Sequence, residues 1–150
     1  VGPAGMVGGQ QSDLEAEGQP VTAAMVGRIH LGKTARLLAA ALAAGAELGG
    51  ATSRTVGLVD GAGLKLGLAF QGADDLLDVE GTAAELGKTA GKDAAAGKAT
   101  WVRVEGLEAA RRRTERLGGQ GLDELRRALP AGPARDRLLE LGALMWRRDR

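Results

Sequence analysis

The sequence contains no cysteine, no tyrosine, one phenylalanine, two tryptophans and one histidine among its 150 residues. Without cysteine, disulfide bonds, thiolate catalysis and cysteine-ligated zinc are excluded. The single histidine, His30, argues against a histidine-based metal site and against a Ser-His-Asp triad. The scarcity of aromatic residues leaves the core to Leu, Ala and Val.

Strong charge of either sign is also missing, and so is a long hydrophobic run. The formal net charge is +1, which gives no indication of nucleic acid or of an anionic membrane as partner. The longest uncharged apolar run, 37–46, is too short to span a bilayer and lacks the flanks of a signal peptide. We therefore expect a soluble, cytoplasmic protein with no membrane span, and the length is enough for residues 1–150 to form one domain.

Apolar residues recur at helical spacing along the chain, and no segment of any length has the period of a strand. This pattern predicts an all-α fold. We expect helices over 23–48 (capped by Thr22), from 55 or 56 to 79, and over 104–117, 122–129 and 135–147. The glycine-punctuated, polar segment 80–100 is predicted to be a loop.

The segment 64–79, LKLGLAFQGADDLLDV, places carboxylates inside an apolar helix. Gln71, Asp74, Asp75 and Asp78 lie at i, i+3, i+4 and i+7, so they share one face. Neighbouring carboxylates on a mostly buried helix are costly unless a cation neutralises them, and Mg²⁺ prefers carboxylate oxygens. The alternative is a solvated acidic face.

Other polar residues have two interpretations when taken alone. Gln10 and Asp13 share a helix face, which fits either a polar surface or a site. Lys33 on its helix and the lysines of the segment 80–100 are typical of solvated side chains, although such a loop can also close over phosphates. His30 is interpreted as a packing or surface residue.

Four motifs together resemble the trans-isoprenyl diphosphate synthases, the family of the farnesyl and geranylgeranyl diphosphate synthases. FQGADDLLD (70–78) resembles the family's second aspartate-rich motif, FQxxDDxxD. GGQQSDLEAEG (8–18), HLGKTARLL (30–38) and LGKTAGKDAAAGKATW (86–101) resemble its GGQxxDLxxEG, HxxKTxxLL and LGKxxGxDxxxGKxTY motifs. The order and the spacing are those of the family.

The resemblance implies the C-terminal half of an all-α isoprenoid-synthase bundle and a Mg²⁺-dependent, head-to-tail prenyl transfer. An allylic diphosphate and isopentenyl diphosphate would give a longer prenyl diphosphate. By resemblance, the implied metal ligands are Asp74, Asp75 and Asp78, and the implied catalytic residues are Lys33, Thr34 and Gln71. The implied substrate-binding residues are Gln10, Asp13, Phe70, Lys88 and Lys98.

The chain also departs from the family pattern. The family's first aspartate-rich motif, which precedes GGQ, is absent, so we expect about half of the enzyme to be missing and the isolated chain to be inactive. A non-catalytic subunit that modulates an active synthase is the alternative, and a homodimer is expected for a full-length protein. A terpene cyclase is disfavoured because the NSE-type pattern fails after Asp74 and Asp75.

Glycines interrupt the helix expected to end at 79. Each costs roughly 0.8–1 kcal/mol relative to alanine in a helix interior. Gly72 stands where the family commonly has a bulky aliphatic residue, and it is interpreted as a defect whose replacement by isoleucine should stabilise the protein if the site has room. Trp101 stands where the family usually has tyrosine.

Overall fold

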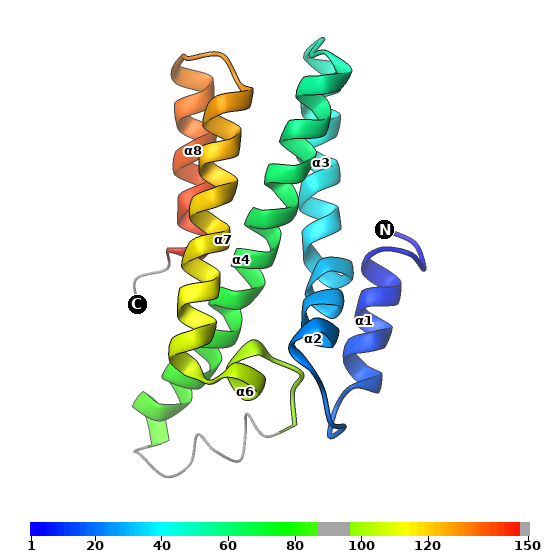
Figure 1. Ribbon diagram of the computed structural model, residues 1–150, viewed down its shortest axis with the longest axis vertical. Helices are drawn as coiled ribbons and strands as arrows, with labels where there is room; N and C mark the ends of the chain where they lie inside the picture. The colour runs from blue at the N-terminus through cyan, green and yellow to red at the C-terminus, as the bar shows by residue number, and fades with distance from the viewer. Residues whose placement is uncertain (87–96, 148–150) are drawn as a thin grey trace.

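The computed structural model is a bundle of helices, the longer of which run roughly along one direction (Figure 1). It describes the backbone of residues 1–86 and 97–147, and the side chains of 1–80 and 97–147. No strand occurs in those ranges, which confirms the predicted all-α class. In chain order the helices are α1 (Met6–Glu15), α2 (Ala23–His30), the π-helical turn η1 (Leu31–Ala35), α3 (Arg36–Leu48), α4 (Ser53–Leu86), α6 (Trp101–Glu105), α7 (Leu107–Ala128) and α8 (Pro133–Trp146).

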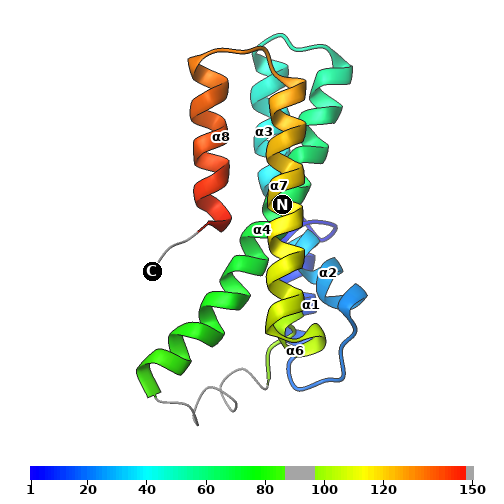
Figure 2. The same ribbon diagram turned by 60° about the vertical axis from the view of Figure 1, so that its left-hand side comes forward.

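Helix α4 is the central element of the bundle. It packs against α7 on one side and against α3 and η1 on the other (Figures 1 and 2). Two glycines of α4 allow this close approach, since a Cβ atom at Gly63 would lie 2.6 Å from Cα of Ala39 and one at Gly67 would lie 2.8 Å from Cβ of Ala35. These glycines are therefore contact points between helices.

Two apolar clusters form the core. One lies around Trp101, between α2, α4 and the start of α7; its buried members are Ala16, Val26, Ile29, Leu76, Ala99, Trp101 and Ala110. The other joins α4 to α7 and α8; its buried members are Val59, Ala62, Leu66, Leu122 and Leu125. Apart from Trp101, the buried members of both clusters are aliphatic, as the composition predicts; Trp146 packs, partly buried, against the second cluster.

The predicted boundaries hold for some helices and fail for others. Helical structure does span 23–48, and the Thr22 hydroxyl accepts a hydrogen bond from the Met25 N–H at 3.3 Å, which confirms the cap. The π-helical turn inside this span was not predicted. Helix α4 ends at Leu86 rather than at 79, so the first part of the predicted loop is helical. The last helix covers Pro133–Trp146, close to the predicted 135–147.

The prediction of two separate helices over 104–117 and 122–129 is wrong. The short α6 ends before Gly106, whose φ is +84°, and α7 then runs without a break from Leu107 to Ala128. Its internal glycine Gly118 faces the indole of Trp146, and a Cβ atom there would overlap that ring. Packing against α8 therefore outweighs the low helix propensity of glycine.

The interpretation of Gly72 as a defect is also wrong. A Cβ atom at this position would overlap the hydroxyl of Thr114 and lie 3.1 Å from the ring of Trp101. Thr114 and Trp101 are both buried. Gly72 is thus the point at which α4 meets α7 and the Trp101 indole, and it leaves no space for a side chain.

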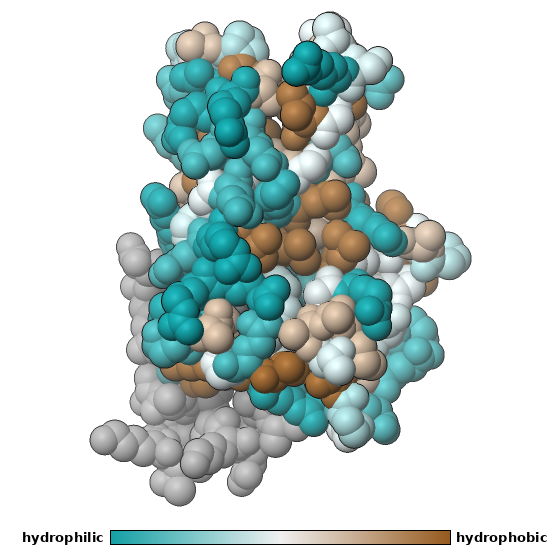
Figure 3. Space-filling view, viewed as in Figure 1, coloured by the Kyte–Doolittle hydropathy of each residue, from teal (hydrophilic) through white to brown (hydrophobic). Residues whose placement is uncertain are grey.

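Several apolar side chains remain at the surface. Figure 3 shows apolar residues gathered in the middle of one face, over α3 and α4. Leu37, Leu141 and Leu144 are 44%, 60% and 67% exposed. Within the part of the chain that the structure describes, no helix is long and apolar enough to cross a membrane.

Candidate diphosphate and metal site

A polar pocket of about 120 Å³ lies between α1, the junction of α2 and η1, the middle of α4, and the segment 97–100. It gathers residues from all four sequence motifs. Its lining consists of Asp13, Glu17, His30, Lys33, Gln71, Asp74, Asp75, Asp78, Lys98, Ala99 and Thr100. Most of the residues predicted from spacing and motif therefore meet at one place.

The shared polar face of α4 is present, as predicted: Gln71, Asp74, Asp75 and Asp78 all line this pocket. Asp74 is half-buried and Asp78 is exposed. The carboxylate of Asp78 accepts a hydrogen bond from the ammonium group of Lys98 at 2.7 Å. That bond raises the pKa of Lys98, so the lysine stays positively charged at neutral pH.

Asp75 differs from its two neighbours because it is 5% exposed. Its Oδ2 accepts a hydrogen bond from the backbone N–H of Trp101 at 3.3 Å. Burial raises the pKa of this carboxyl group to about 7, although the hydrogen bond from Trp101 opposes that rise. Asp75 thus points into the interior.

His30 lies beside Asp75, with Nε2 3.4 Å from the Asp75 Oδ2. It is 2% exposed, and its ring meets the Trp101 ring edge-on with centroids 4.7 Å apart. Burial lowers the pKa of His30 to about 4, so the imidazole is neutral at physiological pH. The interpretation of His30 as a packing residue describes its contact with Trp101 but misses its position at the pocket.

The π-helical turn η1 carries Lys33, which lines the pocket, and Thr34, which is not a lining residue but contacts Gln71. Such turns are frequent at functional sites, because they shift the side chains that follow. Lys33 pairs with Asp13 of α1 at 2.6 Å, and the Thr34 hydroxyl donates to Oε1 of Gln71 at 3.0 Å. The close approach of α1 depends on Gly9, where a Cβ atom would lie 2.7 Å from Cα of Lys33.

Besides Thr34, three predicted residues are not among the lining residues. Gln10 is exposed on α1 and is not among the lining residues, although Asp13 of the same predicted face is. Phe70 is half-buried on α4, next to Gln71. Lys88 lies outside the described residues.

Sequence reasoning also missed the lining residues Glu17, Ala99 and Thr100. A signal for Glu17 was present, since it follows Asp13 by one helical turn in the GGQQSDLEAEG segment. Thr100 is buried, and its hydroxyl accepts a hydrogen bond from the Arg103 N–H at 3.1 Å. It therefore caps α6 at the edge of the pocket.

The donor atoms fit magnesium. Among the described residues, no group of three or more carboxylate or imidazole side chains is arranged to hold a metal ion by itself. Magnesium does not need such a cage, because it binds through one or two carboxylates together with waters and phosphate oxygens. Asp74 and Asp78, one turn apart and both lining the pocket, suit that arrangement, whereas Asp75 is turned toward Trp101.

This combination of fold and site belongs to a known class of protein. Residues 4–125 match the family model described as "Polyprenyl synthetase", and the chain belongs to that family. The fold is the all-α bundle of the isoprenyl synthases.

Curated relatives and solved structures are consistent with this assignment. The farnesyl diphosphate synthase of Escherichia coli is 43% identical over 129 residues, and the chloroplastic geranylfarnesyl diphosphate synthase of Leucosceptrum canum is 41% identical over 128 residues. These matches cover 85% and 83% of this chain but 42% and 35% of those proteins. The chain thus spans less than half the length of these relatives.

Among solved structures, the geranyltransferase of Helicobacter pylori superposes with a TM-score of 0.78 at 28% identity. That match covers 98% of this chain and 46% of the other. A structure of geranyltransferase from the same species, complexed with magnesium and isoprenyl diphosphate, has a TM-score of 0.72 at 33% identity and covers 92% and 45% of the two chains.

Proposed function

We propose that this chain forms one wall of the active site of a Mg²⁺-dependent, short-chain prenyl diphosphate synthase. The reaction joins an allylic diphosphate head-to-tail with isopentenyl diphosphate and yields a longer prenyl diphosphate. The observation that carries this proposal is the convergence of Asp74, Asp78, Lys33 and Lys98 on one pocket, from three different parts of the chain.

The chemistry requires that pyrophosphate leave from the allylic carbon. Loss of this group develops negative charge on the bridging oxygen, and preorganised cations stabilise that charge. Asp74 and Asp78 would hold magnesium, which when bound would supply positive charge against the leaving diphosphate. Lys33 and Lys98 supply the remaining positive charge from η1 and from the segment before α6.

Both lysines are paired before any substrate binds. Lys33 contacts Asp13 and Lys98 contacts Asp78, at 2.6 Å and 2.7 Å. These pairs hold the ammonium groups at the pocket and reduce the cost of concentrating charge there. A diphosphate with its metal brings both signs of charge, so it can replace one partner of each pair. Lys88 is expected to join them by its place in the motif.

The allylic cation formed by ionisation needs oxygen atoms nearby. The Thr34 hydroxyl donates to the side-chain carbonyl of Gln71, so the two side chains orient each other next to the carboxylate face. We assign to their oxygens the stabilisation of the cation and a part in the final proton loss. Phe70 is assigned to the wall of the cavity that receives the hydrocarbon chain.

The isolated chain is expected to be inactive, because it spans 35% and 42% of the length of the two synthases compared above. An opposing carboxylate cluster and a site for isopentenyl diphosphate would come from the remaining part. A full-length protein is expected to be a homodimer.

The test is to join the chain to the N-terminal part of the Escherichia coli farnesyl diphosphate synthase, up to the start of the aligned region. The chain alone, the N-terminal part alone and the chimera are assayed with Mg²⁺, labelled isopentenyl diphosphate and dimethylallyl, geranyl or farnesyl diphosphate. We expect labelled prenyl diphosphate from the chimera alone. A folded chimera without product would refute the proposal, and robust product from the chain alone would refute the requirement for a second part.

A further inference from the structure

The buried carboxylate of Asp75 connects two elements that are far apart in the sequence. Asp75 belongs to the middle of α4, whereas the N–H that it binds belongs to Trp101, the first residue of α6. The first N–H groups of any helix lack partners within that helix. The Thr100 hydroxyl accepts from the Arg103 N–H, and Asp75 accepts from the Trp101 N–H. The amino end of α6 is therefore capped partly by its own segment and partly by α4.

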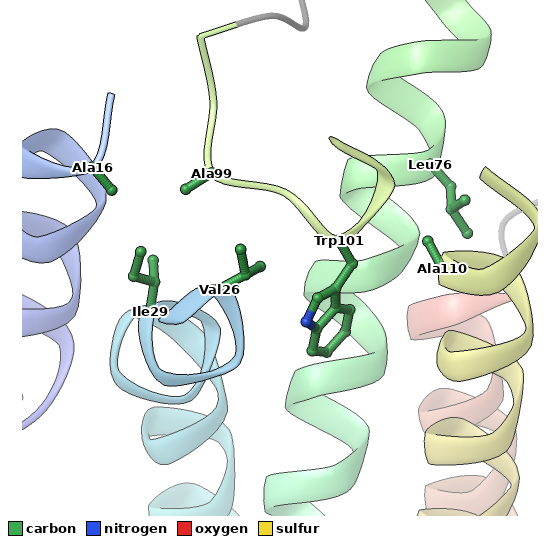
Figure 4. Packing of buried hydrophobic residues seen from close by; sticks show 7 residues of the cluster. All are labelled: Ala16, Val26, Ile29, Leu76, Ala99, Trp101 and Ala110. Carbon is green, nitrogen blue, oxygen red and sulfur yellow. The ribbon is translucent and has the colours of Figure 1, made fainter. Parts of the chain in front are cut away.

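The indole of Trp101 also holds the amino end of α6 in place, through contacts with other helices. The ring is 2% exposed and lies between α2 and α7, against α4 (Figure 4). His30 meets it edge-on at 4.7 Å, and the Arg113 guanidinium lies 5.1 Å from its centroid. Arg113 is itself held by Glu105 through Nε at 3.0 Å and through a second nitrogen. The position of Trp101 is thus determined by three helices.

Lys98 lies three residues before Trp101 and reaches the pocket from this anchored point. The segment is held to α6, because the Arg103 guanidinium donates to the carbonyl oxygens of Gly97 and Lys98 at 3.3 Å and 3.4 Å. Ala99 and Thr100, between Lys98 and Trp101, are buried. Movement of the amino end of α6 would therefore move Lys98 away from Asp78, which it contacts at 2.7 Å.

We infer that Asp75 is a positioning residue: its carboxylate ties the amino end of α6 to α4 and thereby holds Lys98 beside Asp78. Adjacent carboxylates of the same motif then have different tasks. Asp74 and Asp78 face the pocket, and Asp75 fixes the segment that delivers the lysine. The importance of Lys98 rests on the proposed function, whereas the positioning itself can be tested without substrate or metal.

The test uses backbone-amide NMR of the uniformly ¹⁵N-labelled chain in metal-free buffer. Two quantities are measured: the hydrogen-exchange rate of the Trp101 amide, and the order parameters of the amides of residues 97–100. Asp75→Ala removes the acceptor, while Asp75→Asn keeps an oxygen that can accept from the Trp101 N–H. Asp60→Ala, on the same helix but outside the pocket, is the matched control.

In the wild-type chain we expect a protected Trp101 amide and order parameters of about 0.85 for 97–100. In Asp75→Ala we expect exchange at least about tenfold faster at Trp101 and order parameters below about 0.6 for 97–100, with α8 unchanged. Asp75→Asn and Asp60→Ala should resemble the wild type. This rescue separates positioning from a general loss of stability, which would affect α8 as well.

Unchanged order parameters at 97–100 in a folded Asp75→Ala variant would overturn the inference. If Asp75→Ala fails to fold, the wild type and Asp75→Asn provide the test. An unprotected Trp101 amide in the wild type would overturn the inference, and so would disorder of 97–100 in a folded Asp75→Asn variant. Failure of the proposed function gives a different result, namely a chimera that makes no prenyl diphosphate although 97–100 responds to Asp75 as described.

Discussion

Replacing Gly72 by alanine is predicted to destabilise the protein, although the same change removes a glycine from a helix interior. The new methyl group would overlap the hydroxyl of Thr114 and press on the Trp101 ring at 3.1 Å. The ring cannot easily retreat, since it is 2% exposed and lies against His30 and Arg113. Relief must therefore come from a shift of α7 relative to α4 or from a rotation of Thr114.

Two opposing terms set the size of this effect. The gain in helix propensity from glycine to alanine is about 1 kcal/mol. Inserting a methyl group into a filled core costs about 1–3 kcal/mol, and the contact at Thr114 is closer than real Cβ atoms tolerate. We expect a net loss of up to about 2 kcal/mol for Gly72→Ala, and a larger loss for Gly72→Ile.

The assay is urea unfolding followed by circular dichroism, with Gly57→Ala as the matched control. Gly57 lies on the same helix, and a Cβ atom there meets nothing within 4 Å, so this variant should gain about 1 kcal/mol. The double variant Gly72→Ala/Thr114→Ala should recover much of the loss, because Thr114 Oγ1 is the nearest obstacle and has no hydrogen-bond partner among the described residues. Equal stabilisation by Gly72→Ala and Gly57→Ala would refute the close packing at Gly72.

Other consequences follow for pH and for the lysines. Because the pKa of His30 is lowered to about 4 in the folded state, its contribution to stability is complete above pH 6.5 and is lost as the pH falls toward 4. We expect urea unfolding to show that, between pH 7 and pH 4.5, the free energy of unfolding falls by about 2–3 kcal/mol less in His30→Gln than in the wild type. Equal falls in the two proteins would contradict the burial of a neutral imidazole. In the chimera, Lys88→Ala and Lys98→Ala should raise KM for the allylic diphosphate or lower kcat, whereas Lys92→Ala should change little. A selective effect of Lys92→Ala would show that the alignment of 86–101 is out of register.

The sequence was sufficient for the fold class and for the shared polar face of α4, because both depend on periodicity. Helical spacing places Gln71, Asp74, Asp75 and Asp78 on one face whatever the rest of the chain does, and the structure brings that face to a pocket. The motif resemblance added Lys33 and Lys98, which stand alone in sequence and have no local signal. Long-range partners such as the Asp13–Lys33 pair could be expected only from that resemblance.

The failures concern glycine and burial, which depend on tertiary contacts. On sequence alone, Gly72 is interpreted as a defect and Gly118 lies outside the predicted helices, because intrinsic propensity counts only the cost of glycine in an isolated helix. Each instead accepts an aromatic ring, Trp101 or Trp146, from another helix. Asp75 is likewise grouped with Asp74 and Asp78 as a metal ligand, and its burial is not foreseen, since spacing on a helix cannot show which residue another element will cover. That element is α6, whose first residue lies 26 positions further along the chain.

The most direct test of the central claim is the turnover of the chimera with Asp74→Ala. If Asp74 holds the magnesium that neutralises the leaving diphosphate, its loss removes several kcal/mol of transition-state stabilisation, and each ~1.4 kcal/mol corresponds to a factor of ten in rate. We predict that kcat falls by several orders of magnitude while the unfolding curve is unchanged, and that Asp60→Ala retains normal turnover. A folded Asp74→Ala chimera with near wild-type kcat would contradict the assignment of this face of α4 to the diphosphate and its metal.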